Sequence, residues 1–207
     1  MSGRATPGPK PLPRPPALLP RITPLQWQGS LWRIANEQVL TYATYPAPRY
    51  RFDAPGEQYP ALYMCALDIG TFAETYVERG RRLGTAEGQR HLLEAHPKAP
   101  LPIVDLHDDQ VLVALNLDER ISVGDDYSTC QEWALAFHAQ YPDICGIRYR
   151  ARKAGALVAN IFLYADRCAS VLEVVAAPRL EEIPDVVLRA ADRYRLTVYF
   201  PFKQPPP

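Results

Sequence analysis

Short apolar runs of strand length recur along this chain, and segments with helical periodicity separate them. Strands are predicted at 31–34, 61–66, 101–106, 111–115, 147–151, 159–164 and 196–200. In 147–151, apolar side chains alternate with arginines, which is typical of a half-exposed strand. Because strands outnumber helices and their order is mixed, the sequence predicts an α+β fold with a mixed, largely antiparallel central sheet and flanking helices.

Three segments carry the helical signal. Within 68–80, apolar side chains fall at i, i+3, i+4, i+7 and i+8, with Asp68 as the N-cap and Gly80 as the stop. Ser128 and Gln131 fit a capping box, so the next helix is predicted to start at Thr129. The third helix is predicted over 184–194.

Proline content sets the expected domain boundaries. Eight prolines within residues 1–24 exclude a helix and favour an extended, solvated segment, with docking on a partner's aromatic groove as the alternative. We therefore divide the chain into a flexible arm over 1–26, a single domain over 27–203 and a loose tail over 204–207. Residues 81–100 are predicted to form a polar, arginine-rich connection.

Charge and cysteine content exclude several functions. The 23 basic and 23 acidic residues balance, so no overall positive field would attract nucleic acid or an anionic membrane, and neither is predicted as a direct partner. No apolar stretch approaches the roughly 18 residues of a membrane span. The histidines and cysteines show no metal-ligand spacing, so no metal is predicted. Four widely spaced cysteines in apolar contexts indicate buried, reduced thiols and a cytoplasmic location.

Four segments, taken in their order and spacing, resemble the RES-domain family. They are Leu31-Trp32-Arg33-Ile34; Arg51-Phe52 with Leu62-Tyr63 and Ala73-Glu74; Gly124-Asp125-Asp126-Tyr127-Ser128; and Gly146-Ile147-Arg148-Tyr149-Arg150 followed by Asn160 and Phe162. The resemblance implies a fold similar to diphtheria-toxin-like ADP-ribosyltransferases and an activity that cleaves the nicotinamide–ribose bond of NAD. It also implies the toxin of a toxin–antitoxin pair, neutralised by a helix-turn-helix antitoxin.

The same resemblance assigns roles to individual residues. Arg33, Glu74 and Ser128 match the arginine, glutamate and serine that name the family and are implied to be catalytic, with Arg51 and Tyr63 as substrate-binding residues. Plainer explanations remain open: Glu74 lies off the apolar stripe of its helix, where glutamate is typically exposed, and Arg33 would also suit an internal ion pair. Ser128 needs no role beyond the N-cap, although that helix end would also suit a phosphate.

NAD is expected as a consumed substrate, because the sequence contains no glycine-rich phosphate loop of the kinds that bind nucleotide cofactors. No cofactor is therefore predicted, and inorganic phosphate is a candidate co-substrate. Phosphate and water are the expected acceptors, giving an NAD phosphorylase or an NAD glycohydrolase. The alternatives are a mono-ADP-ribosyltransferase that acts on a macromolecule and a non-catalytic interaction module. The oligomeric state, a homo-oligomer included, stays open.

Overall fold

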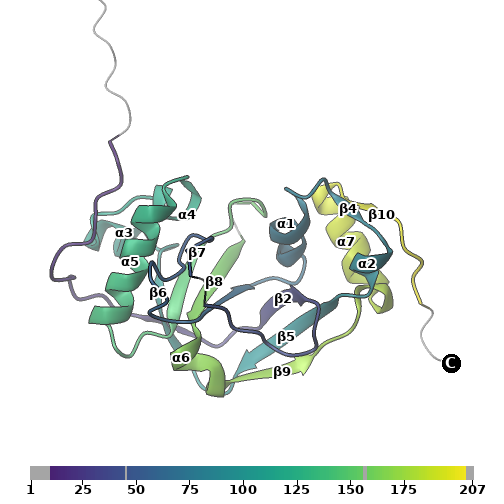
Figure 1. The fold of residues 1–207 in the computed structure, drawn as a ribbon, viewed down its shortest axis with the longest axis horizontal. Coiled ribbons are helices and arrows are strands. Elements are labelled where there is room, and N and C mark those ends of the chain that lie inside the picture. The colour runs from purple at the N-terminus through teal and green to yellow at the C-terminus, as the bar shows by residue number, and fades with distance from the viewer. Residues whose placement is uncertain (1–9, 45, 156–157, 204–207) are drawn as a thin grey trace, which may run out of the picture.

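A mixed sheet of eight strands runs through the protein, and helices cover it (Figure 1). The computed structural model describes residues 10–44, 46–155 and 158–203. The strands lie in the order β1-β6-β7-β8-β3-β2-β5-β9, and every neighbouring pair is antiparallel except β6 and β7. The predicted α+β class with a largely antiparallel sheet is confirmed. The strands are β1 (Leu25–Trp27), β2 (Leu31–Ala35), β3 (Ala61–Cys65), β5 (His91–Pro97), β6 (Leu101–Asp105), β7 (Gly146–Arg150), β8 (Ala159–Tyr164) and β9 (Leu172–Ala176).

Helices gather in two groups toward the two ends of the sheet (Figure 1). One group holds α3 (Asp109–Ala114), α4 (Arg120–Val123) and α5 (Tyr127–Gln140). The other holds α1 (Gly70–Tyr76), α2 (Thr85–Gly88) and α7 (Pro184–Tyr194), with a small parallel ribbon of β4 (Arg82–Leu83) and β10 (Thr197–Val198). Three short helical segments complete the fold: α6 (Ala165–Cys168), η1 (Ala169–Val171) and η2 (Leu180–Glu182).

The apolar core is divided into three clusters. The first contains Trp133 of α5, which is fully buried, and the second joins α1 and α7 through Phe72 and Val187. Strand β8 is buried along its whole length, because Phe162 enters the first cluster while its neighbour Ile161 enters the third. Both faces of the sheet are therefore covered at β8. This packing holds β8 and the neighbouring strands, which carry the candidate site, in place.

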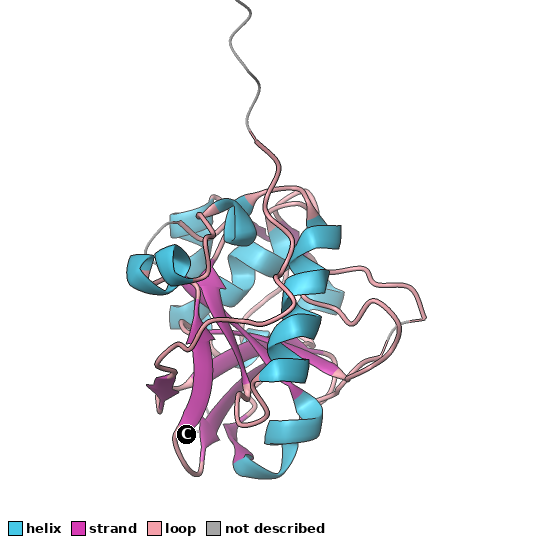
Figure 2. Cartoon of the chain, turned by 90° about the vertical axis from the view of Figure 1, so that its left-hand side faces the viewer, coloured by secondary structure: helices cyan, strands magenta, loops and turns pink. Residues whose placement is uncertain are grey.

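Residues 10–24 are extended, as their prolines predict, but they do not form a free arm. Leu12 and Leu19 are only 7% and 6% exposed and belong to the cluster that contains α5. The Trp133 indole Nε1 donates to the carbonyl of Pro13 at 2.7 Å, and the Leu19 N–H donates to Gln140 Oε1 at 2.8 Å. Figure 2 shows this segment running beside the helices of that end of the molecule. The predicted flexible arm is therefore wrong for residues 10–26, of which Leu25 and Gln26 belong to β1, whereas 1–9 and the tail 204–207 lie outside the described residues.

Some predicted elements differ from the observed ones. Residues 111–115, predicted as a strand, lie in and after helix α3, where the Asp108 side chain caps the helix by accepting from the Gln110 N–H at 2.8 Å. Only Leu112 of this helix is buried, and a short apolar run does not distinguish such a helix from a strand. Residues 81–100 contain β4, α2 and β5 instead of a simple connection. Of the expected closing strand 196–200, only Thr197 and Val198 form a strand, β10, which pairs with β4 outside the main sheet.

The first predicted helix is also shorter than its apolar stripe suggested. Helix α1 begins at Gly70, with Ile69 at the N-cap position, and ends at Tyr76. The Asp68 carboxylate still accepts from the Ile69 N–H at 2.6 Å and also pairs with Arg189 of α7 at 2.7 Å. Asp68 therefore links α1 to α7 in addition to holding the first turn.

All four cysteines lie in the described part of the chain, and all are buried and free of disulfides, as predicted. Burial raises the pKa of Cys65 and that of Cys168 to about 12 in each case, so both thiols stay protonated at neutral pH. Among the described residues, no helix combines the length and the apolar character that crossing a bilayer requires.

Candidate active site

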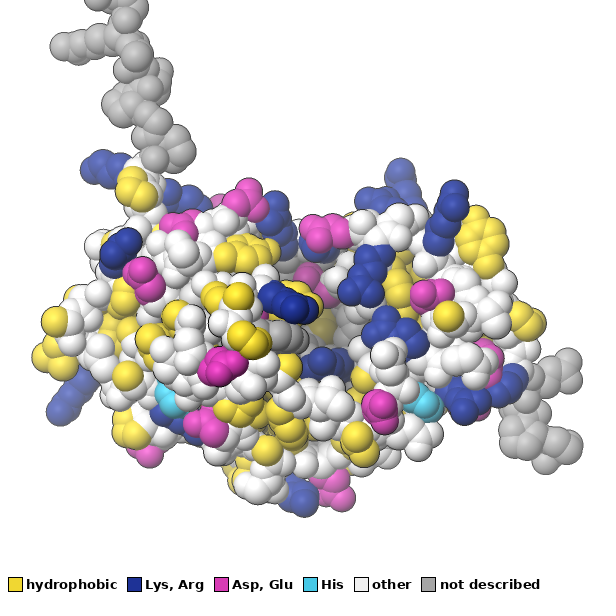
Figure 3. All heavy atoms as spheres, viewed as in Figure 1, with side chains coloured by type: hydrophobic (Ala, Val, Ile, Leu, Met, Phe, Trp, Pro, Cys, Tyr) yellow, Lys and Arg dark blue, Asp and Glu magenta, His cyan; other side chains and the backbone are white. Residues whose placement is uncertain are grey.

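A cleft of about 580 Å³ lies between the two groups of helices, and Figure 3 shows the corresponding hollow in the surface. The volume falls within the range of small-molecule sites. Its lining comes from β2, β3, α1, α4, the first residue of α5, β7, β8 and the connections near them. Within the described residues, β2 and β3 are in register only at Trp32 and Cys65, so these strands diverge beside the cleft and leave room for it.

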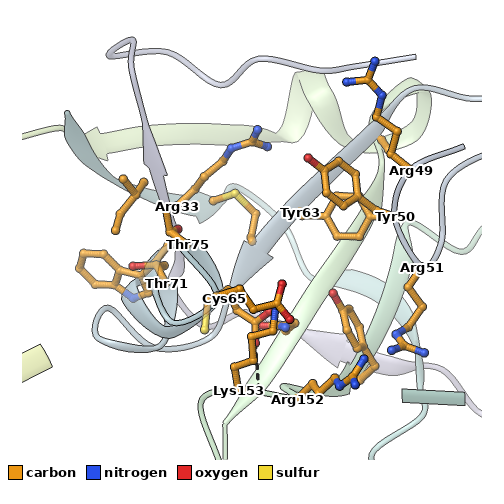
Figure 4. A pocket seen from close by; sticks show the side chains of 18 of the residues that line it. Arg33, Arg49, Tyr50, Arg51, Tyr63, Cys65, Thr71, Thr75, Arg152 and Lys153 are labelled. Atoms are coloured by element: carbon orange, nitrogen blue, oxygen red, sulfur yellow. Dashed lines mark hydrogen bonds and ion pairs between the residues drawn. The ribbon is translucent and has the colours of Figure 1, made fainter. Parts of the chain in front are cut away.

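Four of the five predicted site residues line this cleft. Arg33 comes from β2, Arg51 from the loop before β3, Tyr63 from β3 and Glu74 from α1. Figure 4 shows Arg33, Arg51 and Tyr63 around the same cavity. Ser128 is not among the lining residues, and its side chain is exposed. The fold thus brings an arginine, a carboxylate and a tyrosine together from separate elements, and it leaves the predicted serine outside.

Glu74 is half-buried in the cleft, although its position off the apolar stripe favoured an exposed side chain. The main-chain N–H of Lys153 donates to Glu74 Oε1 at 3.4 Å. Burial is the main cause that raises the pKa values of Cys65 and Tyr149, and the negative charge of Glu74 raises both further. The carboxylate therefore lies near two neutral groups of the cleft, where a positive charge on a ligand would be stabilised.

Asp53, which the sequence analysis did not select, holds the loop at the rim of the cleft. Its Oδ2 accepts from the N–H groups of Arg49 at 2.8 Å and Tyr50 at 2.7 Å, and its Oδ1 accepts from the Tyr63 hydroxyl at 2.9 Å. The Tyr63 oxygen in turn accepts from the Phe52 N–H at 3.0 Å. Burial, followed by the charge of Asp53, raises the pKa of Tyr63 well above its usual value. Because its hydroxyl proton is committed to Asp53, the ring of Tyr63 is the part that remains for ligand contact.

Arg51 joins the rim loop to the corner between α4 and α5. Its guanidinium donates to the carbonyl oxygens of Gly124 at 2.7 Å and Ile121 at 3.3 Å, and to Cys130 Sγ at 3.5 Å. It also lies 4.6 Å from the centre of the Tyr127 ring. The residue is only 6% exposed, so a positive charge held by neutral partners is placed beside the cleft.

Ser128 is not the N-cap of α5. The helix begins at Tyr127, two residues before the predicted start, and Asp126 is the cap: its Oδ1 accepts from the Thr129 N–H at 3.1 Å and from the Ser128 hydroxyl at 2.9 Å. These hydrogen bonds, those of Thr129 first, lower the pKa of Asp126. A carboxylate of the chain caps this helix end, which disfavours a further anion there, so the geometry gives no support to the expectation that it receives a phosphate.

Basic side chains that the sequence analysis did not select surround the cleft, namely Arg49, Arg79, Arg90, Arg152 and Lys153. Arg152 Nη1 lies 2.6 Å from Asp125 Oδ1, and Lys153 Nζ lies 2.6 Å from Glu78 Oε1. Two successive residues after β7 therefore reach opposite walls of the cleft, one before α5 and the other after α1. In Figure 3, lysine and arginine side chains lie on both sides of the hollow. Their scatter along the sequence gave no signal, and only folding gathers them.

Polar groups without partners lie inside the cleft. Ser122 of α4 and Asn160 of β8 are 1% and 5% exposed, and both line it. In the described part of the chain, Ser122 Oγ and Asn160 Oδ1 have no hydrogen-bond partner, although the Asn160 side chain is hydrogen-bonded to Tyr149. Buried polar atoms are nearly always paired, so these two are candidates for ligand contact. The motif that contains Asn160 signalled it in the sequence, whereas nothing signalled Ser122.

The cleft thus combines two carboxylates, the half-buried Glu74 and the more exposed Glu78, with several cations and unpaired hydrogen-bonding groups. Glu74 can stabilise a developing positive charge, and the arginines can bind anionic groups such as phosphates. Among the described residues, no three histidine, cysteine, aspartate or glutamate side chains are grouped as metal ligands would be.

Comparisons with known proteins agree with this architecture. The family model for the RES domain matches residues 30–185. A chain in the crystal structure of the M. tuberculosis MbcT–MbcA toxin–antitoxin complex has a similar fold, with a TM-score of 0.58 at 19% sequence identity. The superposition covers 76% of this chain and 87% of that chain. No curated protein sequence matches.

Proposed function

Because this chain belongs to the RES-domain family, we propose that it cleaves the nicotinamide–ribose bond of NAD and acts as the toxin of a toxin–antitoxin pair. The observation that carries the proposal is Glu74, a half-buried carboxylate in the same cleft as Arg33, Arg51 and several further cations. Breaking this bond develops positive charge on the ribose, which a nearby carboxylate stabilises, while the cations hold the pyrophosphate.

In this proposal Glu74 is the catalytic carboxylate, and Arg33 and Arg51 are the residues that hold the phosphates. The ring of Tyr63 packs against the ligand, because its hydroxyl is bound to Asp53. Nicotinamide leaves as a neutral molecule, so the leaving group needs no general acid. Phosphate or water then attacks the ribose carbon from which nicotinamide has left. With phosphate as the acceptor the enzyme is a phosphorylase, and with water it is a glycohydrolase. Ser128 has no part in the proposed site, because it lies outside the cleft.

The direct test is release of free nicotinamide when the purified protein is incubated with NAD, with and without inorganic phosphate. Mass analysis of the ADP-ribosyl product then distinguishes phosphate, water and a macromolecule as the acceptor. Glu74→Gln is expected to lower kcat by about 100-fold or more, since it removes the charge and keeps the size of the side chain. Glu78→Gln is the control within the cleft: Glu78 also lines it, but its side chain is 69% exposed and pairs with Lys153, so only the half-buried Glu74 is expected to matter for kcat.

Two results would refute the enzymatic proposal. One is no nicotinamide release from the wild-type protein together with no effect of NAD on its melting temperature, which would favour a non-catalytic interaction module. The other is equal activity in the Glu74→Gln and Glu78→Gln variants. A labelled macromolecule in the product analysis would instead identify a mono-ADP-ribosyltransferase.

The proposed partner is an antitoxin, in the form of a small helix-turn-helix protein. The similar fold comes from a toxin–antitoxin complex, which supports this choice of partner. Expression of the wild-type chain alone is expected to stop growth, and Glu74→Gln is expected to restore it. Co-expression of a helix-turn-helix protein from the neighbouring reading frame should also restore growth and should co-purify with this chain. Unimpaired growth on expression of the wild-type chain would contradict the toxin role.

A further inference from the structure

Ser122 carries a buried hydroxyl that the fold leaves without a partner. It lies in α4, is 1% exposed and lines the cleft. Its main-chain N–H is satisfied by the carbonyl of Glu119 at 2.9 Å, but in the described part of the chain its Oγ has no hydrogen bond. A buried hydroxyl without a partner destabilises the folded state, so its presence beside an open cleft indicates a group that is paired when a ligand binds.

The Arg51 guanidinium lies against the segment that contains Ser122. The Arg51 guanidinium donates to the carbonyl oxygens of Ile121 and Gly124, the residues on either side of the segment that contains Ser122. A guanidinium has five N–H donors, and the contacts to Ile121, Gly124 and Cys130 leave some of them for a ligand. None of these partners is negatively charged, so the contacts do not neutralise the cation. A hydroxyl donor and a guanidinium thus lie at one corner of the cleft.

The acidic residues that follow α4 do not neutralise this corner either. Asp125 pairs with Arg152 at 2.6 Å, and its side chain is 83% exposed. Asp126 caps α5 through the Thr129 N–H and is bound by the Ser128 hydroxyl. Neither carboxylate is paired with Arg51 in the described part of the chain, so the corner keeps a positive character that favours an anion.

We propose that Ser122 and Arg51 form a phosphate-binding corner in which the Ser122 hydroxyl donates to a phosphate oxygen. The inference rests on the proposed function and extends it by one residue. The same chemistry would serve the pyrophosphate of NAD or an inorganic phosphate acceptor. A serine hydroxyl and a guanidinium are common ligands of phosphate, and the guanidinium supplies the charge while the hydroxyl supplies direction.

The test compares Ser122→Ala with Ser170→Ala, a serine in an exposed position of η1. Without ligand, Ser122→Ala is expected to melt at the wild-type temperature or above it, because the substitution removes an unpaired buried hydroxyl and introduces a better helix former. With substrate, KM is expected to rise about tenfold, as for one lost hydrogen bond to a charged group, with a smaller change in kcat. Ser122→Cys, which keeps the size and weakens the donor, should resemble Ser122→Ala.

The kinetic readout identifies the source of the phosphate. A higher KM for NAD assigns the corner to the pyrophosphate, and a higher KM for inorganic phosphate alone assigns it to the acceptor. A lower melting temperature with unchanged KM values would overturn the proposal, because the hydroxyl would then be structural. Unchanged KM values for both substrates at an unchanged melting temperature would overturn it as well.

The phosphate-binding corner can be tested even if the protein proves not to cleave NAD. If the wild-type protein releases no nicotinamide from NAD, isothermal titration with inorganic phosphate still tests the corner. Weaker phosphate binding by Ser122→Ala than by wild type and Ser170→Ala would then support it. Equal binding by all three proteins, or no binding by any of them, would refute it.

Discussion

Replacement of Leu19 by alanine is expected to destabilise the protein, although this residue lies in a segment whose composition suggests a flexible arm. Leu19 is 6% exposed and packs in the cluster that contains α5. A buried leucine reduced to alanine loses its transfer free energy and leaves a cavity, together about 2–5 kcal/mol. Because Leu19 lies in a segment without regular secondary structure, which can partly collapse onto the cavity, we expect the lower part of this range, about 2–3 kcal/mol. In a protein of this size, that loss lowers the melting temperature by roughly 4–12 °C.

Leu18 provides the matched control, because it is the adjacent residue, has the same side chain and is 83% exposed. Leu18→Ala should leave the free energy of unfolding within about 0.5 kcal/mol of wild type. The assay is thermal and urea unfolding of the full chain, followed by circular dichroism. The hydrogen bond from the Leu19 N–H to Gln140 is a main-chain bond, so it is retained in the variant. If Leu19→Ala and Leu18→Ala unfold together with wild type, residues 10–24 do not dock on α5 and our reasoning is refuted.

Two further predictions concern the rim loop and the response to alkali. Asparagine at position 53 has one acceptor oxygen, so Asp53→Asn leaves either the two N–H groups of the loop or the Tyr63 hydroxyl without an acceptor. We expect the free energy of unfolding in urea to fall by about 1–3 kcal/mol and the KM for NAD to rise, and an unchanged urea midpoint would contradict the role of Asp53. Burial raises the pKa values of Cys65 and Cys168 to about 12, above the value of an unfolded thiol near 8.5. The unfolded state therefore loses these protons first, so the free energy of unfolding is expected to fall as pH rises through about 9 toward 12. The double variant with alanine at both positions should show a flatter dependence in the same range, and an equally steep one would refute the assignment.

The strands that sequence analysis located correctly are those whose side chains carry a clear pattern. Residues 159–164 became β8 because a continuous apolar run can be buried on both faces of a sheet. Strand β5 was missed, although it lies between β2 and β9, because its sequence HLLEAHP alternates poorly and contains two histidines and a glutamate. Pairing with its neighbours, which no local pattern encodes, makes it a strand.

The candidate site was predictable to the extent that short motifs signal it. The motif pieces selected Arg33, Glu74, Arg51 and Tyr63, and all four line the cleft. The resemblance also selected Ser128, which lies outside the cleft, and the capping pattern placed the N-cap two residues too late, since the cap is Asp126. Asp53 and Ser122 were missed because their importance comes from hydrogen bonds made or left unmade across the fold. The partners of Asp53 lie only 3, 4 and 10 residues away, but no local motif encodes the loop conformation that brings them together, and the pairing of the Ser122 hydroxyl depends on the packing around it.

The sequence by itself determined the α+β class, most of the strands and the family, because side-chain periodicity and motif spacing are local properties of the chain. Tertiary structure alone decided that the proline-rich segment docks on α5, since an extended chain is free or bound according to the surface that it meets. It also decided which polar groups share the cleft. Hydrogen bonding and electrostatic attraction act over a few ångströms in space, and only the folded chain brings Glu74, Arg51 and Ser122 to one cavity.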